Sequence, residues 1–217
     1  RVEHGAGKAR RRHLADQVEL RRAVGEEHAD QPDLRGRGRK RGDPRANRGN
    51  SRGVAPDAGS ARLFLALWPE EPVRQALLAC RDAWQWGRNA GKVPSRHLHL
   101  TVHFLGEVPR VRVPALTRGL AVPVTPFELV LAPLAVWPNG VAVWEPAACP
   151  AELTRLHDQL SRALVRLDVP LEERPYRPHV TLARRARDAA PPACVPPLSW
   201  PVDHYALVES CPGVPRR

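Results

Sequence analysis

The chain has 217 residues, of which 42% are hydrophobic, and it carries 34 Lys and Arg against 23 Asp and Glu, for a formal net charge of +11. This length allows one domain or two small lobes with a buried core, and the basic balance favours contact with polyanions such as RNA without establishing it. No apolar run approaches the roughly 18 residues that cross a bilayer, and the four cysteines form no CxxC pair, so we expect a cytoplasmic protein without membrane contact.

Residues 1–60 differ in composition from the rest of the chain. They contain no Phe, Trp or Tyr and carry 15 Lys and Arg against 9 Asp and Glu. Such a segment buries too little apolar surface to offset a chain entropy of roughly 1–2 kcal/mol per residue. We therefore expect a disordered, basic, Arg/Gly-rich extension that is dispensable for chemistry, with a basic RNA-binding arm as the alternative.

After this extension, patterns of strand and helix length follow one another. ARLFLALWP predicts a buried strand at 61–69, and the stretch after it predicts a helix at 70–86. HLHLTVHFLG predicts a strand at 97–106, and a helix-like stretch at 109–120 is weakened by an internal proline. Two strands joined by a Pro-Asn-Gly turn are expected within 127–146.

The strongest pattern is the leucine repeat in PAELTRLHDQLSRALVRL, residues 150–167. Its leucines recur at steps of three and four residues, as on the apolar stripe of an amphipathic helix: Leu153, Leu156, Leu160, Leu164 and Leu167. A strand at 177–185, a proline-rich loop and a last strand at 199–210 complete the pattern. Because strand and helix alternate twice, residues 61–217 are expected to form two similar α+β lobes.

The strand at 97–106 carries polar side chains at alternate positions. On a regular strand His97, His99, Thr101 and His103 share one face, while the apolar residues between them share the other. Three histidines at this spacing are compatible with a metal site. A histidine beside a threonine hydroxyl is equally compatible with acid–base chemistry on a phosphate.

A second copy of the pattern favours the phosphate interpretation. HVTL at 179–182 repeats HLTV at 99–102, so His179 and Thr181 match His99 and Thr101. A metal site leaves the second copy unexplained, and no nearby Asp, Glu or Cys completes a ligand set. We therefore expect no metal and no cofactor. Two histidines supply an acid and a base near neutral pH, and threonine hydroxyls donate hydrogen bonds to phosphoryl oxygens.

With these motifs the sequence resembles the 2H phosphoesterase superfamily, and within it the RNA 2′,3′-cyclic phosphodiesterases, or 2′-5′ RNA ligases. The resemblance covers about residues 62–210 and rests on RLFLALWP, HLHLTVHFLGEV, LHDQLSRALVRL and RPYRPHVTLARR. It implies a bilobal α+β fold in which two pseudo-symmetric antiparallel sheets with flanking helices surround a central cleft. Since family members continue into a further strand, we expect the domain at 61–217 to lack its C-terminal edge strand.

The resemblance also implies an activity. It is the metal-independent hydrolysis of RNA 2′,3′-cyclic phosphate ends, including those of tRNA halves, to a 2′-phosphate by a monomeric enzyme. His99 would be the acid toward the 3′ oxygen and His179 the base. Two alternatives stay open: a 2H enzyme acting on a small cyclic nucleotide such as ADP-ribose 1″,2″-cyclic phosphate, and a non-catalytic module that binds RNA ends.

Three further residues are candidates for substrate contact. Arg184 matches a family arginine near the phosphate, but its odd spacing from His179 requires a bulge or a strand end to bring it to the same face. Phe64 resembles a position near the nucleobase, and packing in the core is the equal alternative. His103 faces the cleft if its strand is regular. His157 and His204 are expected to be structural or surface residues.

Overall fold

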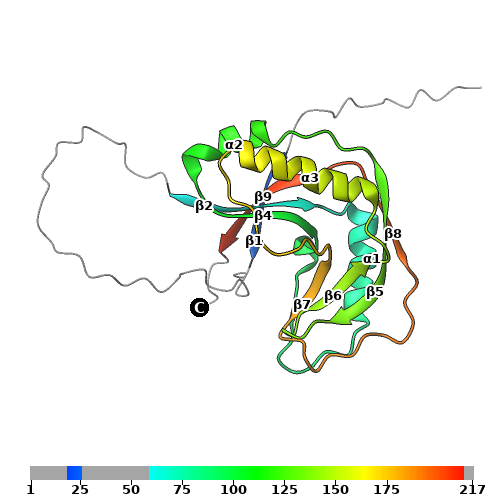
Figure 1. The fold of residues 1–217 in the computed structure, drawn as a ribbon. Coiled ribbons are helices and arrows are strands. Elements are labelled where there is room, and N and C mark those ends of the chain that lie inside the picture. Colours follow the sequence, from blue (N-terminus) through cyan, green and yellow to red (C-terminus); the bar gives the residue numbers. More distant parts are fainter. Residues whose placement is uncertain (1–18, 26–58, 213–217) are drawn as a thin grey trace, which may run out of the picture.

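The structure of the protein is a computed structural model that describes residues 19–25 and 59–212 (Figure 1). Its helices are α1 (Glu71–Asp82), α2 (Val113–Gly119) and α3 (Ala151–Arg166), with 3₁₀ turns at Ser95–His97 and Arg110–Arg112. Its strands are β1 (Glu19–Gly25), β2 (Ser60–Leu67), β3 (Gly91–Lys92), β4 (Leu100–Pro109), β5 (Phe127–Val136), β6 (Ala142–Pro146), β7 (Val180–Arg184), β8 (Leu198–Val202) and β9 (Ala206–Pro212).

These strands form one curled sheet in the order β1-β9-β2-β4-β7-β6-β5-β8, with β3 beside β7 (Figure 1). A strand–helix–strand unit occurs in each half, β2-α1-β4 in the first and β6-α3-β7 in the second, and the two strands of each unit are antiparallel neighbours. In the part of the chain that the structure describes, a single registered pair, Leu100 with Val180, joins β4 to β7. The expected bilobal, antiparallel α+β fold is therefore confirmed, with both halves in one continuous sheet.

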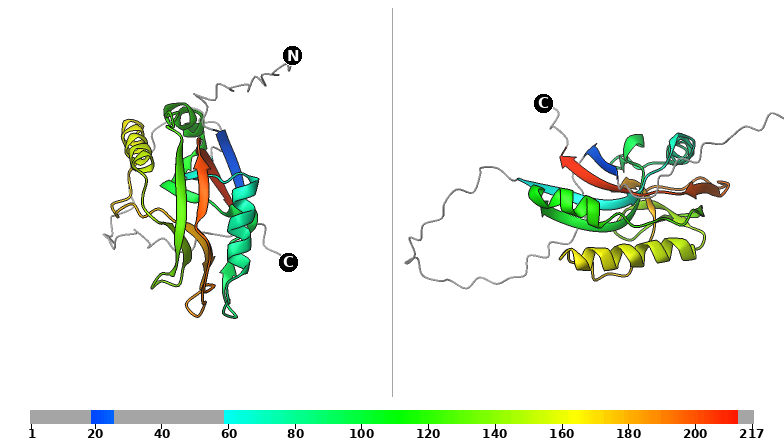
Figure 2. Two further views of the ribbon diagram at one scale, coloured as in Figure 1. Left: turned by 90° about the vertical axis from the view of Figure 1, so that its right-hand side faces the viewer. Right: turned by 90° about the horizontal axis from the view of Figure 1, so that it is seen from above.

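Each long helix packs against the half of the sheet to which it does not belong. α3 contacts β4 of the first half, whereas α1 contacts β8 of the second. Both views of Figure 2 place these helices on opposite sides of the sheet. α3 buries the apolar stripe expected from its sequence, namely Leu153, Leu156, Leu160, Ala163 and Leu164. Burial of these side chains against the opposite half holds the two halves together.

A second, smaller apolar cluster lies on the other face of β2. It consists of Phe64, Ala66, Trp68, Ala206 and Val208, with Phe104 packed against it. Alternate residues of β2 thus serve two different clusters, as the period of a strand requires.

The last strand expected from the sequence, at 199–210, is two strands. β8 pairs with β5 at the end of the sheet, where Pro201 lies opposite Glu128, and β9 pairs with β2 in the other half. The chain crosses between the halves at 203–205. The Tyr205 hydroxyl accepts a hydrogen bond from the backbone N–H of Val122 at 2.8 Å and donates to the Leu120 carbonyl. Burial raises the pKa of Tyr205 to about 12, which keeps this donor protonated.

One part of the N-terminal extension lies within the described residues. Residues 19–25 form β1, which pairs in parallel with β9 from Glu19 opposite Ala206 to Gly25 opposite Pro212. The sequence pattern did not predict this strand, because backbone pairing along β9 supplies hydrogen bonds that do not depend on an apolar side-chain pattern. The remainder of 1–58 and residues 213–217 lie outside the described residues.

Replacing Leu160 by alanine should lower the free energy of unfolding by about 3 kcal/mol, because a fully buried leucine leaves a cavity when it is shortened. Urea unfolding followed by circular dichroism measures this change. Val165→Ala on the same helix is the matched control, since Val165 is 59% exposed, and it should cost less than about 0.5 kcal/mol. Equal losses for the two variants would contradict the packing of α3 against β4.

Candidate active site

His99 lies directly before β4, where a 3₁₀ turn at Ser95–His97 leads the chain into the strand. Its Nδ1 lies 2.7 Å from the carbonyl oxygen of His97. A carbonyl only accepts, so Nδ1 carries the proton. The ring stacks on Trp68 at 5.3 Å between centroids and contacts Phe64 at 4.9 Å. The strand expected from residue 97 thus begins at Leu100, and the turn before it supplies the acceptor that orients His99.

His179 repeats this arrangement directly before β7. Its Nδ1 donates to the carbonyl of Arg177 at 2.8 Å, two residues back in the chain, as His99 does to His97. The ring lies 4.4 Å from that of Trp137. The Arg177 guanidinium lies over Trp137 at 4.3 Å and donates to Glu145 at 2.8 Å. Each histidine is therefore held by a backbone carbonyl and an indole ring.

The register of β4 and β7 brings the two motifs together. Leu100 pairs with Val180, so extension of this antiparallel register by one residue on each side places His99 opposite Thr181 and Thr101 opposite His179. Leu100 and Val180 are fully buried, whereas the four flanking residues are half-buried on the other face. The two histidines are diagonal neighbours, for which about 7–8 Å between Cα atoms is typical.

The two rings are in the same tautomer. Because a carbonyl engages each Nδ1–H, proton transfer by either ring would take place at Nε2. An unprotonated Nε2 accepts a proton, and a protonated Nε2 donates one. The same anchoring thus suits either an acid or a base, and the surroundings of each ring decide which.

Burial is the largest cause that lowers the pKa of His179. The Arg177 carbonyl and the Glu145 carboxylate raise this pKa, while the positive charges of Arg184 and Arg174 lower it further. Because the net direction is downward, His179 is neutral at neutral pH and its Nε2 is able to accept a proton.

A bulge in β7 turns Arg184 toward the site. Thr181 pairs with Val143 but Ala183 pairs with Ala142, so one step on β6 matches two on β7. Leu182 and Ala183 are consequently buried in succession, and Arg184 returns to the half-buried face. Its effect on the pKa of His179 is consistent with this placement. The structural condition for a role of Arg184 is therefore met.

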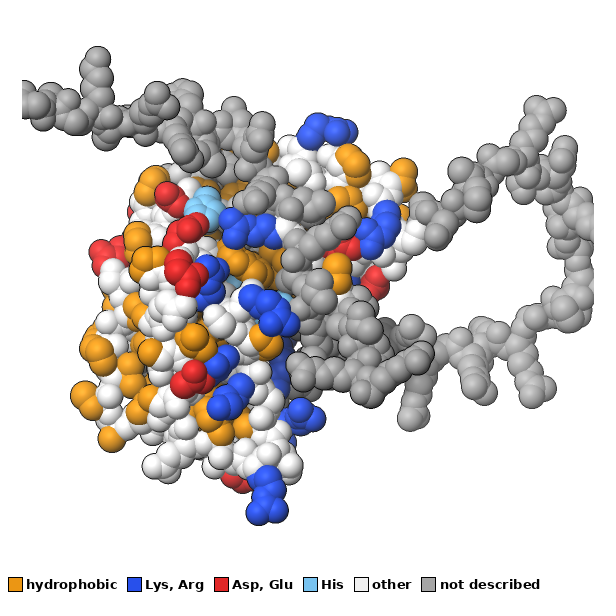
Figure 3. All heavy atoms as spheres, turned by 180° about the vertical axis from the view of Figure 1, so that it is seen from behind, with side chains coloured by type: hydrophobic (Ala, Val, Ile, Leu, Met, Phe, Trp, Pro, Cys, Tyr) orange, Lys and Arg blue, Asp and Glu red, His pale blue; other side chains and the backbone are white. Residues whose placement is uncertain are grey.

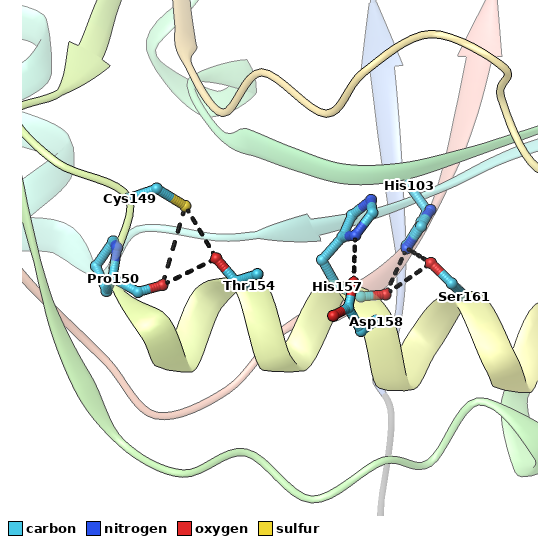
Figure 4. Close-up of polar contacts among 7 residues, drawn as sticks. All are labelled: His103, Cys149, Pro150, Thr154, His157, Asp158 and Ser161. Carbon is cyan, nitrogen blue, oxygen red and sulfur yellow. Dashed lines mark hydrogen bonds and ion pairs between the residues drawn. The ribbon is translucent and has the colours of Figure 1, made fainter.

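The expectation that His103 faces the cleft is wrong. A shift of register in β4 pairs Ala66 with Thr101 but Leu65 with His103, so His103 joins the face that packs on α3. Its Nε2 lies 2.9 Å from the His157 carbonyl and 3.2 Å from the Ser161 hydroxyl oxygen (Figure 4). His99 and His103 therefore lie on opposite faces of the sheet and do not converge on one point, as a shared metal ion would require.

Phe64 lies on the same face as His99 but is only 2% exposed. It packs in the small cluster on β2, as the core interpretation expects, and it also contacts the ring of His99. His97 is half-buried, and its carbonyl orients His99. The contacts of Trp68 and Trp137 with the two histidines were not predicted from the sequence. In the sequence each of these tryptophans is followed by a proline. Trp68 comes directly after β2 and Trp137 directly after β5.

Two strand–helix–strand units, each with a His-x-Thr motif at the centre of one sheet, define a two-histidine phosphoesterase fold. A family model described as the 2′-5′ RNA ligase superfamily matches residues 69–211. The chain belongs to this superfamily, and the resemblance inferred from its motifs is confirmed.

Two curated relatives bear the name RNA 2′,3′-cyclic phosphodiesterase. The protein from Thermus thermophilus is 37% identical over 164 residues, covering 69% of this chain and 81% of the relative. The protein from Escherichia coli K12 is 32% identical over 153 residues, covering 68% and 83%. The structure of E. coli LigT complexed with 3′-AMP aligns with a TM-score of 0.58 and 27% identity, over 69% of this chain and 88% of that one. Within residues 19–25 and 59–212, no helix is long and apolar enough to cross a membrane.

Replacing His103 by glutamine, which keeps a donor for the His157 carbonyl, should reduce the loss of stability in acid. Burial lowers the pKa of His103, so the unfolded chain binds the proton first as the pH falls below about 6.5. The stability that the buried, neutral His103 contributes is therefore fully present above about pH 6.5. It is lost as the pH falls toward the lowered pKa of His103 in the folded state. The difference in unfolding free energy between about pH 7.5 and about pH 5.5 should be smaller in the variant by urea unfolding. An unchanged difference would contradict the buried placement.

Proposed function

We propose that this protein is an RNA 2′,3′-cyclic phosphodiesterase that opens the cyclic phosphate to a 2′-phosphate with His99 and His179 as acid and base. The observation that carries the proposal is the matched pair of histidines, each anchored through Nδ1 to the carbonyl two residues before it. The names of the relatives from T. thermophilus and E. coli support the reaction, and the E. coli LigT complex with 3′-AMP supports nucleotide binding in this fold.

His179 is the base in this proposal. Burial lowers its pKa, so at neutral pH its Nε2 holds a lone pair that accepts a proton from water. The resulting hydroxide equivalent attacks phosphorus. His99 is the acid, and its protonated Nε2 donates to the 3′ oxygen as the bond from phosphorus to that oxygen breaks. The products are a 2′-phosphate and a free 3′ hydroxyl, and the two rings exchange protonation states, which solvent restores.

Thr101 and Thr181 donate hydrogen bonds to the phosphoryl oxygens in this mechanism. Each threonine lies across the strand pair from the histidine of the other motif, so a phosphate between the motifs is within reach of both hydroxyls. The bulge in β7 brings the Arg184 guanidinium to the same face, where it supplies positive charge to the phosphate. The proposal needs no metal ion to neutralise the developing charge.

The surroundings of the site suit an RNA end. Phe64 and Trp68 are buried and pack against the ring of His99, so the wall of the site behind this histidine is aromatic. Lys and Arg side chains run in a loose band down the middle of the described surface in Figure 3, which favours a polyanion. We further propose that tRNA halves are among the substrates and that the enzyme acts as a cytoplasmic monomer.

Replacing His99 or His179 by alanine should lower kcat/KM by more than about 10²-fold, because each removes one proton-transfer group. The double variant should be little worse than the worse single one, since both groups act on one transition state. The substrate is a short oligonucleotide with a 2′,3′-cyclic phosphate, assayed with a chelator present and with the product end identified. His204→Ala is the control, because this histidine belongs to neither motif and lies beside Asp203 and Glu70 at the crossover after β8.

Other outcomes of this assay separate the alternatives. A 3′-phosphate product, or strict dependence on a divalent ion, would contradict the proposed mechanism. Binding of the oligonucleotide without turnover would favour the RNA-end-binding module. Much faster opening of ADP-ribose 1″,2″-cyclic phosphate than of the oligonucleotide would identify a small-molecule enzyme.

Arg184→Ala should lower kcat/KM and move the acid limb of its pH profile to higher pH. The arginine is one of the charges that lower the pKa of His179, so its removal raises the pH at which the base loses its proton-accepting form. The profile of kcat/KM against pH measures both effects. Arg185→Ala is the matched control, because Arg185 is the exposed neighbour, and its acid limb should not move. If the acid limb of Arg184→Ala does not move, the charge of Arg184 does not lower the pKa of His179, which contradicts the prediction.

A further inference from the structure

Three aromatic rings from separate elements stack next to the second motif. The ring of His157, on α3, lies between His103 of β4 and Tyr176 of the segment before β7. The centroids of His103 and His157 are 4.2 Å apart with 18° between their planes, and those of His157 and Tyr176 are 4.2 Å apart with 15°. We call these three side chains the ring stack. It connects the strand of the first motif, through a helix, to the segment that carries the second.

The His103 end of the stack is fixed. Its Nε2 donates to the carbonyl of His157 at 2.9 Å, and the Ser161 hydroxyl donates to the same carbonyl at 2.9 Å (Figure 4). β4 itself is paired with β2 along its length and with β7 at Leu100. His157 is thus held by its own helix, α3, and by its contact with His103 on a strand within the sheet.

The Tyr176 end belongs to a segment with little backbone support. Among the described residues, positions 170–177 make no backbone–backbone hydrogen bonds outside regular elements. Pro170, Pro175 and Pro178 have no N–H to donate. The place of this segment therefore depends on side chains, and Tyr176 is packed against the core through the stack.

The ring, and not the hydroxyl, makes the contact of Tyr176. Its hydroxyl oxygen is buried and has no hydrogen-bond partner among the described residues. A buried hydroxyl without a partner costs free energy and adds no stabilising bond. Removing the hydroxyl while keeping the ring is consequently a clean control for the function of the stack.

The residue after Tyr176 orients the proposed base. The carbonyl of Arg177 accepts the Nδ1–H of His179 at 2.8 Å, so the position of this peptide sets the direction of the imidazole ring. We propose that His157 and Tyr176 are positioning residues, whose stacked rings fix the segment at 170–178 so that the Arg177 carbonyl holds His179 in its reactive orientation. The kinetic part of this inference rests on the proposed function, whereas the structural part does not.

The first motif supplies an internal comparison. His99 makes the same bond to the carbonyl of His97, but that carbonyl belongs to a 3₁₀ turn outside the ring stack. A change that acts only on the stack should therefore affect the hydrogen bond of His179 and spare that of His99. A change that loosens the whole protein should affect both.

The test observes the two imidazole N–H protons by NMR in the intact chain. His179→Gln and His99→Gln assign the two signals by their loss. In His157→Leu, which keeps side-chain bulk but not a flat ring, the His179 proton should exchange with water at least about tenfold faster while the His99 proton changes less than about twofold. In His157→Phe and Tyr176→Phe both protons should exchange as in the natural protein, because the rings remain.

Kinetics of cyclic phosphate opening give the second readout. His157→Leu should lower kcat about tenfold with KM within about twofold, and His157→Phe should restore kcat. Tyr176→Leu replaces His157→Leu if the latter does not fold. Parallel acceleration of both N–H exchanges, or no acceleration in either leucine variant, would overturn the positioning role. If the unmutated protein binds the RNA end but does not open its cyclic phosphate, the proposed function is refuted. The comparison of the two N–H exchange rates would still decide the role of the stack.

Discussion

The pairing of Leu100 with Val180 is the contact on which the rest of the site depends. It is the one registered pair between β4 and β7 in the described chain, and it fixes which residues of the two motifs face each other. Because both side chains are fully buried, the residues before and after them turn to the opposite face. One apolar cross-strand pair thus brings two distant His-x-Thr segments into a single group. A slip of one residue would send all four polar side chains into the core.

The backbone of the site is nearly symmetric, but its surroundings are not. Both histidines are oriented by the carbonyl two residues before them. His99 then lies against Phe64 and Trp68, whereas His179 lies beside Trp137 and near the charged groups Glu145, Arg184 and Arg174. A duplicated motif can supply both an acid and a base only if the two histidine rings have different surroundings, even though both are anchored by a backbone carbonyl. The proposed division of roles follows from this asymmetry.

Sequence periodicity predicted the parts of the fold that follow a regular pattern. The leucine stripe was sufficient to predict the long helix α3, since burial repeats with the period of the element, and the alternation of strand and helix predicted two lobes. The bulges were not predictable, because a register shift at Val102 or Leu182 depends on the partner strand and leaves no mark in local composition. They account for the wrong face assigned to His103 and for the open question at Arg184. β1 was not predicted because it pairs with β9 through backbone groups. These groups are the same in every sequence and leave no pattern of side chains to recognise.

The end of the sheet at β8 has a consequence for how molecules meet one another. Pairing with β5 continues on both sides of Pro201, so the proline nitrogen faces away from β5. The outward row of hydrogen-bond donors is therefore interrupted at the fourth residue of a strand of only five. A strand from a second molecule that aligned there would gain few bonds and would leave one of its own carbonyls without a partner. The β8 edge of the sheet is in this way a poor template for polymerisation into fibres.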